Sequence, residues 1–359
     1  MAGRGHEVAL ALQQIGSAPA GCDAWQAPLW PGQLTTLARR ASVTPATMGD
    51  ILAVLGLGEP GTLAALIHGW DRILAAVRPD IVMAEFAPAL MMAAYGRTPV
   101  LALGNGFSLP PADLPRFPSL TRQPTVHDEA ALLERVNEAL VRHGLPPRES
   151  LPGIFQADRE LASVFTELDP YRPWRKSALG VPSAYLTEAA ANGGGEELFI
   201  YMNGREPRPD AFWQGLVRSG LKIRIHDPGL SSKDAGTLAA AGLLVEPRPI
   251  PFQRIAERSR LLLSHGGLGF VSSGLLAGIP QLIVPRDIEK RMIAAGVQEL
   301  GLGVTLDNID ADGLAAALRA GFEDEALAAR ARAAAPGFRA RMVASPAAEA
   351  VDAAEALLG

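Results

Sequence analysis

The sequence predicts an α/β fold with two Rossmann-like, doubly wound domains of parallel strands. Short apolar runs typical of buried strands alternate with helix-like segments along the chain, which is the pattern of a parallel sheet. The length of 359 residues is too great for one ordinary domain and suits two. The alternation lapses between about residues 168 and 195, where turn-forming residues end in three consecutive glycines. We therefore expect an amino-terminal domain over residues 1–180 and a carboxy-terminal domain, with a terminal helix, over residues 181–359.

The clearest helix of the first half is predicted over Gly61–Val77. Its apolar residues recur every three or four positions, as one face of an amphipathic helix requires, and Thr62 is the expected cap. These residues are Leu63, Leu66, Ile67, Trp70, Leu74 and Val77. The other predicted elements are strands at Val8–Leu12, in WQAPLWPG, at Ile81–Ala84, in TPVLALGNGF and at Leu161–Phe165, and helices in PALMMAAYG and at Val126–His143.

The second half restarts with a strand in ELFIYMNG and repeats the alternation. We predict a helix around Pro209–Ser219 and a terminal helix in EAVDAAEALLG. The further predicted strands are Lys222–His226, Leu243–Val245, Leu261–Ser264 and Gln281–Val284, with a helix between each pair.

The composition argues against a nucleic-acid partner. Hydrophobic residues make up 48% and charged residues 20% of the chain, which is typical of a globular protein. The net charge is −5, and the basic residues are scattered among acidic ones. Binding to phosphate backbones needs a clustered basic surface instead.

A single cysteine, Cys22, excludes a disulfide within the chain and predicts a reducing compartment. The stretch SAPAGC resembles a lipoprotein cleavage box, but the apolar run before it, Val8–Leu12, is too short. Charged residues such as Arg78 and Glu85 interrupt the best candidate for a membrane span. We expect a cytoplasmic protein without a membrane span.

A phosphate-binding turn is predicted in RLLLSHGGLGFVSSGLLAGIPQLIVP. A buried strand, Leu261–Leu263, leads into Ser264-His265-Gly266-Gly267, and a helix begins at Leu268. The free N–H groups and the positive dipole end of a helix amino terminus bind phosphate, and His265 can donate a hydrogen bond to it. A Gly-Gly turn that only allows tight packing is the structural alternative.

From Pro249 to Leu306 the sequence resembles the nucleotide-sugar-dependent glycosyltransferases of family 1, which include UDP-glucuronosyltransferases and antibiotic and flavonoid glycosyltransferases. The segments AGIPQLIVP, RDIEKR and LGLGVTL follow the glycine turn in the same block. RGHEV, VRPDIVMAEF, PVLALGNGF and FTELDPY extend the resemblance into the first half. The resemblance implies the GT-B fold, in which two Rossmann-like domains face each other, and a nucleoside diphosphate sugar as donor.

The resemblance also implies a donor site in the second half. His265, Gly266, Gly267 and Gly269 correspond to the turn that holds the diphosphate. The expected donor contacts outside that turn are Ile250 at the nucleobase, Asn203 and Gly204 at the phosphates, and Glu289 and Lys290 at the sugar hydroxyls.

Three positions depart from the family pattern. Lys290 replaces a glutamine, Phe270 replaces a serine or threonine that touches phosphate, and Ser273 replaces a glutamate for the ribose. These changes leave the backbone N–H groups of the phosphate site in place, whereas fewer side chains remain that can contact the ligand. For Glu289 the alternative is a solvated acid in the first turn of the next helix.

The acceptor side is predicted in the first half. Glu85 follows one strand, and Asn105 and Phe107 follow the next. Relatives place acceptor contacts and a helper carboxylate on these loops, so Glu85 is the candidate general base. The alternatives are a helix-capping role for Glu85 ahead of Pro88 and a turn role for Asn105.

RGHEV resembles the entry to the family's second strand, so His6 is expected to be structural. The usual catalytic histidine would lie upstream of Met1, and we expect the first strand, loop and helix of the amino-terminal domain to be missing. Either the native protein starts further upstream, or Val8–Leu12 closes up directly beside Ile81–Ala84. His68, His127, His143 and His226 show no partner pattern.

The sequence therefore predicts an inverting glycosyltransferase that uses a UDP- or dTDP-sugar and a small-molecule acceptor, with little activity in this form. No obligatory metal is expected, because no DxD-type acid cluster lies near a donor loop and helix amides and His265 can meet the diphosphate charge. The alternatives are a non-catalytic module that binds a nucleotide sugar or a partner protein, and an epimerase or hydrolase of nucleotide sugars.

Overall fold

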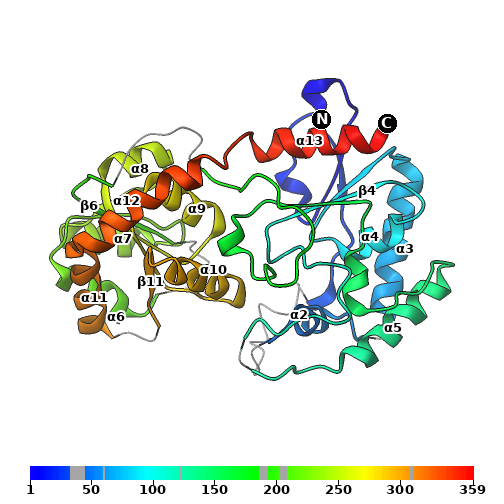
Figure 1. The fold of residues 1–359 in the computed structure, drawn as a ribbon, viewed down its shortest axis with the longest axis horizontal. Helices are drawn as coiled ribbons and strands as arrows, with labels where there is room; N and C mark the ends of the chain where they lie inside the picture. Colours follow the sequence, from blue (N-terminus) through cyan, green and yellow to red (C-terminus); the bar gives the residue numbers. More distant parts are fainter. Residues whose placement is uncertain (33–44, 60, 122, 186–192, 203–207, 308–309) are drawn as a thin grey trace. The chain divides into compact units, whose positions relative to one another are not determined.

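A computed structural model of the protein describes residues 1–32, 45–59, 61–121, 123–185, 193–202, 208–307 and 310–359. The chain divides into two compact units. Unit 1 comprises Met1–Ser163, Tyr171–Gly180 and Ala347–Gly359, and unit 2 comprises Val164–Pro170 and Val181–Pro346. Both units are α/β, and all pairings between their described strands are parallel (Figure 1).

Unit 2 contains a six-stranded parallel sheet in the order β11-β10-β9-β6-β7-β8. Its strands are β6 (Glu197–Tyr201), β7 (Ile223–His226), β8 (Leu244–Val245), β9 (Ser259–Ser264), β10 (Gln281–Ile283) and β11 (Gly303–Thr305). Its helices are α6 (Asp210–Ser219), α7 (Ser232–Ala240), α8 (Phe252–Arg258), α9 (Leu268–Ala277), α10 (Ile288–Glu299), α11 (Ala311–Glu323) and α12 (Glu325–Arg339). The predicted doubly wound sheet is confirmed here.

The core of unit 2 lies along the two central strands. Leu198 and Ile200 of β6 and Leu261 and Leu263 of β9 are fully buried, which explains why both strands read as unbroken apolar runs. Helices α6 and α11 pack closely at Gly215, which has no side chain. A Cβ at this position would lie only 2.9 Å from Cβ of Leu314.

The described strands of unit 1 form two separate parallel sheets. One pairs β1 (Ala9–Leu12) with β2 (Asp23–Gln26), and the other has the order β3 (Val82–Glu85), β4 (Val100–Gly104), β5 (Arg159–Ala162). Among the described residues no ladder joins β1 to β3, so the alternative in which Val8–Leu12 closes up beside Ile81–Ala84 is wrong. The backbone of β1 bonds instead to β2, in a register that places Ala9 opposite Asp23.

The helices of unit 1 are α2 (Met48–Leu55), α3 (Thr62–Val77), α4 (Pro88–Ala94), α5 (Glu129–Arg142) and α13 (Pro346–Leu358). The apolar face predicted for α3 is confirmed, since Leu63, Ile67 and Trp70 are buried. The predicted cap, Thr62, is wrong. Gly61 precedes the helix with a positive φ of 79°, and no side chain caps the first turn.

The last helix, α13, packs in unit 1, although the sequence predicts it in the second domain. Its Ala353 and Ala354 are fully buried against Leu101 of β4 and Leu161 of β5. The small side chains bring the helix close to the strands, a pairing between distant segments that local periodicity does not reveal. Figure 1 shows both chain termini beside α13, and there the His6 imidazole Nε2 lies 3.0 Å from Oε1 of Glu355.

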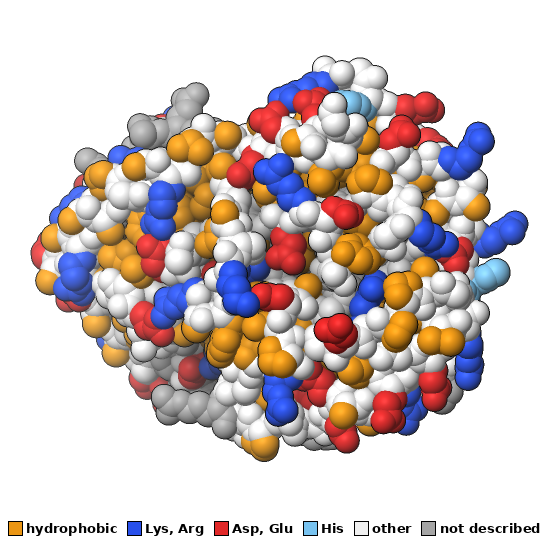
Figure 2. All heavy atoms as spheres, turned by 45° about the vertical axis from the view of Figure 1, so that its right-hand side comes forward, with side chains coloured by type: hydrophobic (Ala, Val, Ile, Leu, Met, Phe, Trp, Pro, Cys, Tyr) orange, Lys and Arg blue, Asp and Glu red, His pale blue; other side chains and the backbone are white. Residues whose placement is uncertain are grey.

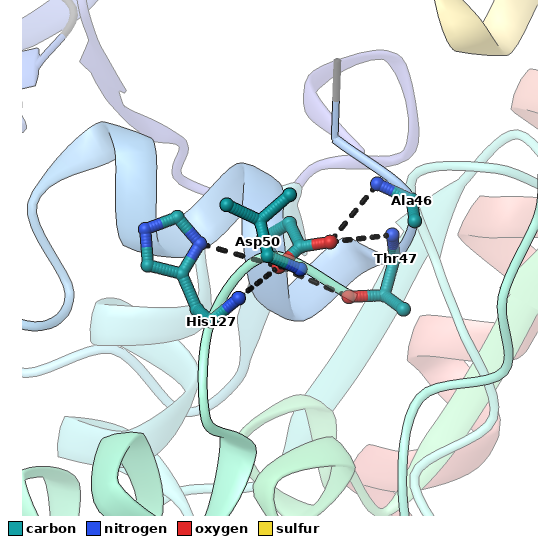
Figure 3. A network of polar contacts seen from close by, with 5 residues as sticks. Ala46, Thr47, Asp50 and His127 are labelled. Atoms are coloured by element: carbon teal, nitrogen blue, oxygen red, sulfur yellow. Dashed lines mark hydrogen bonds and ion pairs between the residues drawn. The ribbon is translucent and has the colours of Figure 1, made fainter. Parts of the chain in front are cut away.

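A buried carboxylate fixes the start of α2 (Figure 3). Asp50 is 1% exposed, and its Oδ2 accepts hydrogen bonds from the N–H groups of Ala46 and Thr47. Its Oδ1 accepts from the N–H groups of Val126 and His127, and Nδ1 of His127 lies 3.2 Å from it. Burial raises the pKa of Asp50, but these hydrogen bonds outweigh it and hold the pKa below its ordinary value. His127 thus has a partner that the sequence does not indicate.

Acidic and basic side chains are interspersed over the face drawn in Figure 2. Cys22 is exposed. Within the described ranges, no helix is both long and apolar enough to cross a membrane.

Candidate functional site

The candidate site lies where the strand order of the unit 2 sheet reverses. From β6 the chain first adds β7 and β8 on one side, and then returns to add β9, β10 and β11 on the other. Tyr201, at the carboxyl end of β6, pairs in register with Ser264, at the carboxyl end of β9. Ligands of open α/β sheets bind outside the carboxyl ends of the strands at such a point.

The turn after β9 allows only glycine at its centre. Gly266 has a φ of 91°, and a Cβ there would lie 2.9 Å from Cγ2 of Ile283 and 3.2 Å from the carbonyl oxygen of Lys290. The Gly266 N–H donates to Oγ of Ser264 at 3.2 Å. The turn is therefore held both by its own strand and by its neighbours.

Helix α9 begins directly after this turn with an open amino end. Its N-cap residue is Gly267, and no side chain caps the helix. A Cβ at Gly267 would lie 3.0 Å from Nε2 of His265, and one at Gly269 would lie 3.1 Å from Cζ of Tyr185. The first N–H groups of the helix are thus not satisfied by a capping side chain, and the glycines keep bulk away from them.

His265 lies beside this helix end in a buried position. It is 6% exposed, and its ring centroid is 5.5 Å from that of Tyr201. Burial lowers the pKa of His265, and the cations Lys290 and Arg208 lower it further, against the opposing effects of the Tyr201 backbone and Asp287. The imidazole is therefore neutral at neutral pH, with one N–H to donate. Its Nδ1 has no hydrogen-bond partner among the described residues.

Arg208 is a site residue that the sequence reasoning missed. It is buried, its guanidinium carbon lies 5.8 Å from the ring centroid of Phe212, and its charge acts on His265. A buried arginine just before α6 therefore adds positive charge that acts on His265. In the sequence, the signal that could have indicated Arg208 is a basic residue after the first strand of the second half. The predicted phosphate contacts Asn203 and Gly204 lie outside the described residues.

Glu289 and Lys290 occupy the first turn of α10 near the same turn. Nζ of Lys290 lies 2.6 Å from Oε2 of Glu289, and both side chains are largely buried. The Lys290 N–H donates to Oδ1 of Asp287, which caps the helix. The reading of Glu289 as a solvated acid does not fit this burial. Lys290 itself adjoins the glycine turn, since a Cβ at Gly266 would lie 3.3 Å from Cβ of Lys290.

The other departures from the family pattern have structural roles. Phe270 is buried, with its ring 5.1 Å from that of Tyr201 and 5.3 Å from that of Phe252. Ser273 donates through Oγ to the carbonyl of Gly269 and accepts from the Tyr185 N–H. Ile250 is half-buried, two residues ahead of α8.

The acceptor-side candidates of unit 1 differ among themselves. Glu85 is exposed at the end of β3, and α4 has no side-chain cap, so the capping role for Glu85 is wrong. Asn105 forms a turn, in which its Oδ1 accepts from the Ser108 N–H at 2.8 Å. Phe107 is half-buried in that turn. In the part of the chain that the structure describes, no three His, Cys, Asp or Glu side chains are arranged to hold a metal ion.

Comparisons with known proteins agree with this architecture. Residues 244–357 match the family model described as Erythromycin biosynthesis protein CIII-like, C-terminal domain. The chain is 32% identical over 83 residues to NDP-glycosyltransferase YjiC of Bacillus subtilis (strain 168), a match covering 23% of this chain and 21% of that protein. The chain thus matches about a fifth of that relative's length.

Solved structures extend the likeness over nearly the whole chain. The calicheamicin glycosyltransferase CalG4 has a TM-score of 0.66 at 20% identity and covers 95% of this chain and 87% of its own. The spinosyn rhamnosyltransferase SpnG has a TM-score of 0.59 at 17% identity and covers 99% and 93%. SsfS6 of Streptomyces sp. SF2575, complexed with thymidine diphosphate, has a TM-score of 0.53 at 18% identity and covers 87% and 80%. These findings confirm the GT-B fold.

Proposed function

We propose that the protein is a glycosyltransferase with the GT-B fold, that its unit 2 binds a nucleoside diphosphate sugar, and that it transfers the sugar to an acceptor hydroxyl with inversion. The open amino end of α9, together with buried His265 and Arg208 at the strand-order reversal, carries this proposal. UDP and dTDP are the expected nucleotides. The thymidine diphosphate held by SsfS6 supports the second of them.

The proposed roles follow from where negative charge accumulates. The bond between the anomeric carbon and the diphosphate oxygen breaks, and its electron pair leaves with the diphosphate. Helix N–H groups, Arg208 and Lys290 stabilise that charge, and neutral His265 donates a hydrogen bond to it. Glu289 accepts hydrogen bonds from sugar hydroxyls, and Ile250 packs against the nucleobase.

The acceptor oxygen bonds to the anomeric carbon from the opposite face, and its proton passes to a base. Glu85 is the carboxylate we propose for this step, with Asn105 and Phe107 near the acceptor. Glu85 has no hydrogen-bonding partner among the described residues that would orient it. We therefore expect slow transfer, and binding of a nucleotide sugar without transfer is the second candidate function.

Two measurements separate these functions. Calorimetric titration with UDP and dTDP tests binding, and chromatography of a dTDP-sugar incubated with a panel of hydroxylated acceptors tests transfer. Transfer is supported if the nucleotide binds, a new glycoside forms, and Glu85→Gln lowers the rate at which that glycoside forms. Binding without any product supports the binding module, and no binding of either nucleotide contradicts both.

A further inference from the structure

Unit 1 contains a hollow of about 970 Å³ beside β5, the edge strand of its three-stranded sheet. All of its walls come from unit 1. They are residues 111–115 after β4, residues 147–150 after α5, residues 153 and 156–160 leading into β5, and Lys176 and Ser177. None of these residues belongs to the donor site of unit 2.

Arg148 lies in the wall of this hollow in a fixed position. Its backbone N–H donates to Oδ1 of Asn137 at 2.7 Å, and its carbonyl accepts from Nδ2 of the same side chain at 3.0 Å. Its guanidinium carbon lies 5.3 Å from the ring centroid of Tyr95. Asn137 of α5 and the Tyr95 ring therefore hold both ends of the residue.

The charge of Arg148 is buried without a counterion. The residue is 8% exposed, its Nε has no hydrogen-bond partner, and no carboxylate of the described residues forms an ion pair with it. The burial lowers the pKa of Arg148. A cation–π contact compensates only part of the cost of desolvating a guanidinium. Such a group is stabilised when an anion pairs with it.

The carboxylates that line the hollow are engaged elsewhere or exposed. Asp113 pairs with Nζ of Lys176 at 2.7 Å, and Asp158 accepts the Val100 N–H at 2.7 Å. Glu160 accepts from Oγ of Ser177 at 3.3 Å, and burial raises the pKa of its carboxyl. Glu149, the fourth, is exposed.

Neutral polar groups complete the lining. Gln156 donates through Nε2 to the Tyr95 hydroxyl at 2.9 Å, so an amide lies next to the ring that carries Arg148. Its carbonyl oxygen and the carboxylates of the wall are acceptors for hydroxyl groups. Of the cations in the lining, Lys176 pairs with Asp113 and Arg159 is exposed, so Arg148 is the buried one. The lining thus offers one buried cation for an anion and several acceptors for hydroxyls.

We propose that this hollow binds a small hydroxylated solute whose oxyanion, a carboxylate or a phosphate, pairs with the guanidinium of Arg148. Arginine forms two parallel hydrogen bonds with either group. The binding is independent of the donor site, so it requires neither UDP nor dTDP.

The test uses NMR of the whole protein with ¹⁵N-labelled arginine. The Nε–H signal of Arg148 is assigned by its loss in Arg148→Lys, and wild type is titrated with inorganic phosphate and with glycolate, against sodium chloride of equal ionic strength. We expect a saturable shift of that signal with at least one of the two anions. A response to phosphate alone or to glycolate alone identifies the oxyanion.

Matched variants check the site by calorimetry. Arg148→Gln is expected to weaken the effective anion about tenfold or more, which corresponds to about 1.4 kcal/mol. Lys176→Gln alters an exposed cation of the same hollow, already paired with Asp113, and is expected to bind like wild type. The proposal is overturned if neither anion shifts the wild-type Arg148 signal beyond the chloride control, or if Lys176→Gln loses as much affinity as Arg148→Gln.

Discussion

The imidazole ring of His265 lies 5.5 Å from the phenol ring of Tyr201, centroid to centroid, at the carboxyl ends of the two central strands of unit 2. The imidazole is buried, and its burial together with the charges of Lys290 and Arg208 lowers the pKa of His265. The open end of α9 follows His265 by three residues. The His265 imidazole and the amino end of α9 thus follow the carboxyl end of β9, and the charges of Lys290 and Arg208 act on that imidazole.

The glycine turn gives the first prediction. Gly267→Val is expected to abolish binding of UDP and dTDP, because its Cβ displaces the His265 ring and its methyl groups occupy the space in front of the helix N–H groups. The unfolding transition of unit 2 should persist. Gly236→Val is the matched control, since a Cβ there meets nothing within 4 Å. Unchanged calorimetric affinity of Gly267→Val would show that the phosphates bind elsewhere.

Arg208 gives the second prediction. Arg208→Gln is expected to weaken free nucleotide and sugar nucleotide alike, by about 10- to 100-fold, because a charged hydrogen bond contributes about 1.5–3 kcal/mol. The nucleotide affinity of Arg208→Gln should also depend less on salt concentration than that of wild type. Arg218→Gln removes an exposed arginine of α6 that pairs with Asp312, and should bind normally. Equal effects of the two substitutions would assign Arg208 a role in folding alone.

How far the sequence predicts this site depends on how local each signal is. The turn at His265 is readable because strand, glycines and helix are consecutive. For Arg208 the sequence offers only a basic residue after the first strand of the second half, and nothing local indicates that this residue is buried. Asn105 fits a family position, yet its side chain closes a turn with Ser108. The docking of α13 on β4 and β5 likewise joins segments far apart in the chain.

Glu289 distinguishes the sugar from the nucleotide. Glu289→Ala is expected to weaken a UDP- or dTDP-sugar about tenfold, about 1.4 kcal/mol, while free UDP or dTDP changes little. The difference arises because the carboxylate accepts from sugar hydroxyls. Glu257→Ala, at an exposed acid of α8, serves as control. Equal losses for both ligands in competition calorimetry would refute the assigned role.

The buried imidazole predicts a pH dependence of stability. The pKa of His265 is lowered from 6.5 in the folded state, so the unfolded chain binds the proton more readily. The contribution of His265 to folding is therefore complete above pH 6.5 and is lost as the pH falls below it. Thermal unfolding of wild type and His265→Asn between pH 7.5 and about 5 checks this. A wild-type melting temperature that falls no more steeply than that of the variant would contradict it.

Asp50 predicts the stability of unit 1. Asp50→Asn is expected to lower its unfolding free energy by about 2–4 kcal/mol, since an amide cannot accept from all of the N–H groups around the carboxylate. Because the pKa of Asp50 is held below 3.8, wild type should lose this stabilisation only as the pH falls through that lowered pKa. Asp80→Asn, at an exposed acid of unit 1, is the control in urea unfolding. Equal midpoints for all three proteins would show that the network contributes nothing.

The most direct test of the donor site is a crystal structure of the protein with bound dTDP. We predict that phosphate oxygens lie within hydrogen-bond distance of N–H groups in the first turn of α9 and of the His265 imidazole, with the guanidinium of Arg208 alongside. A well-ordered nucleotide whose diphosphate lies away from the His265–Gly267 turn would contradict the account.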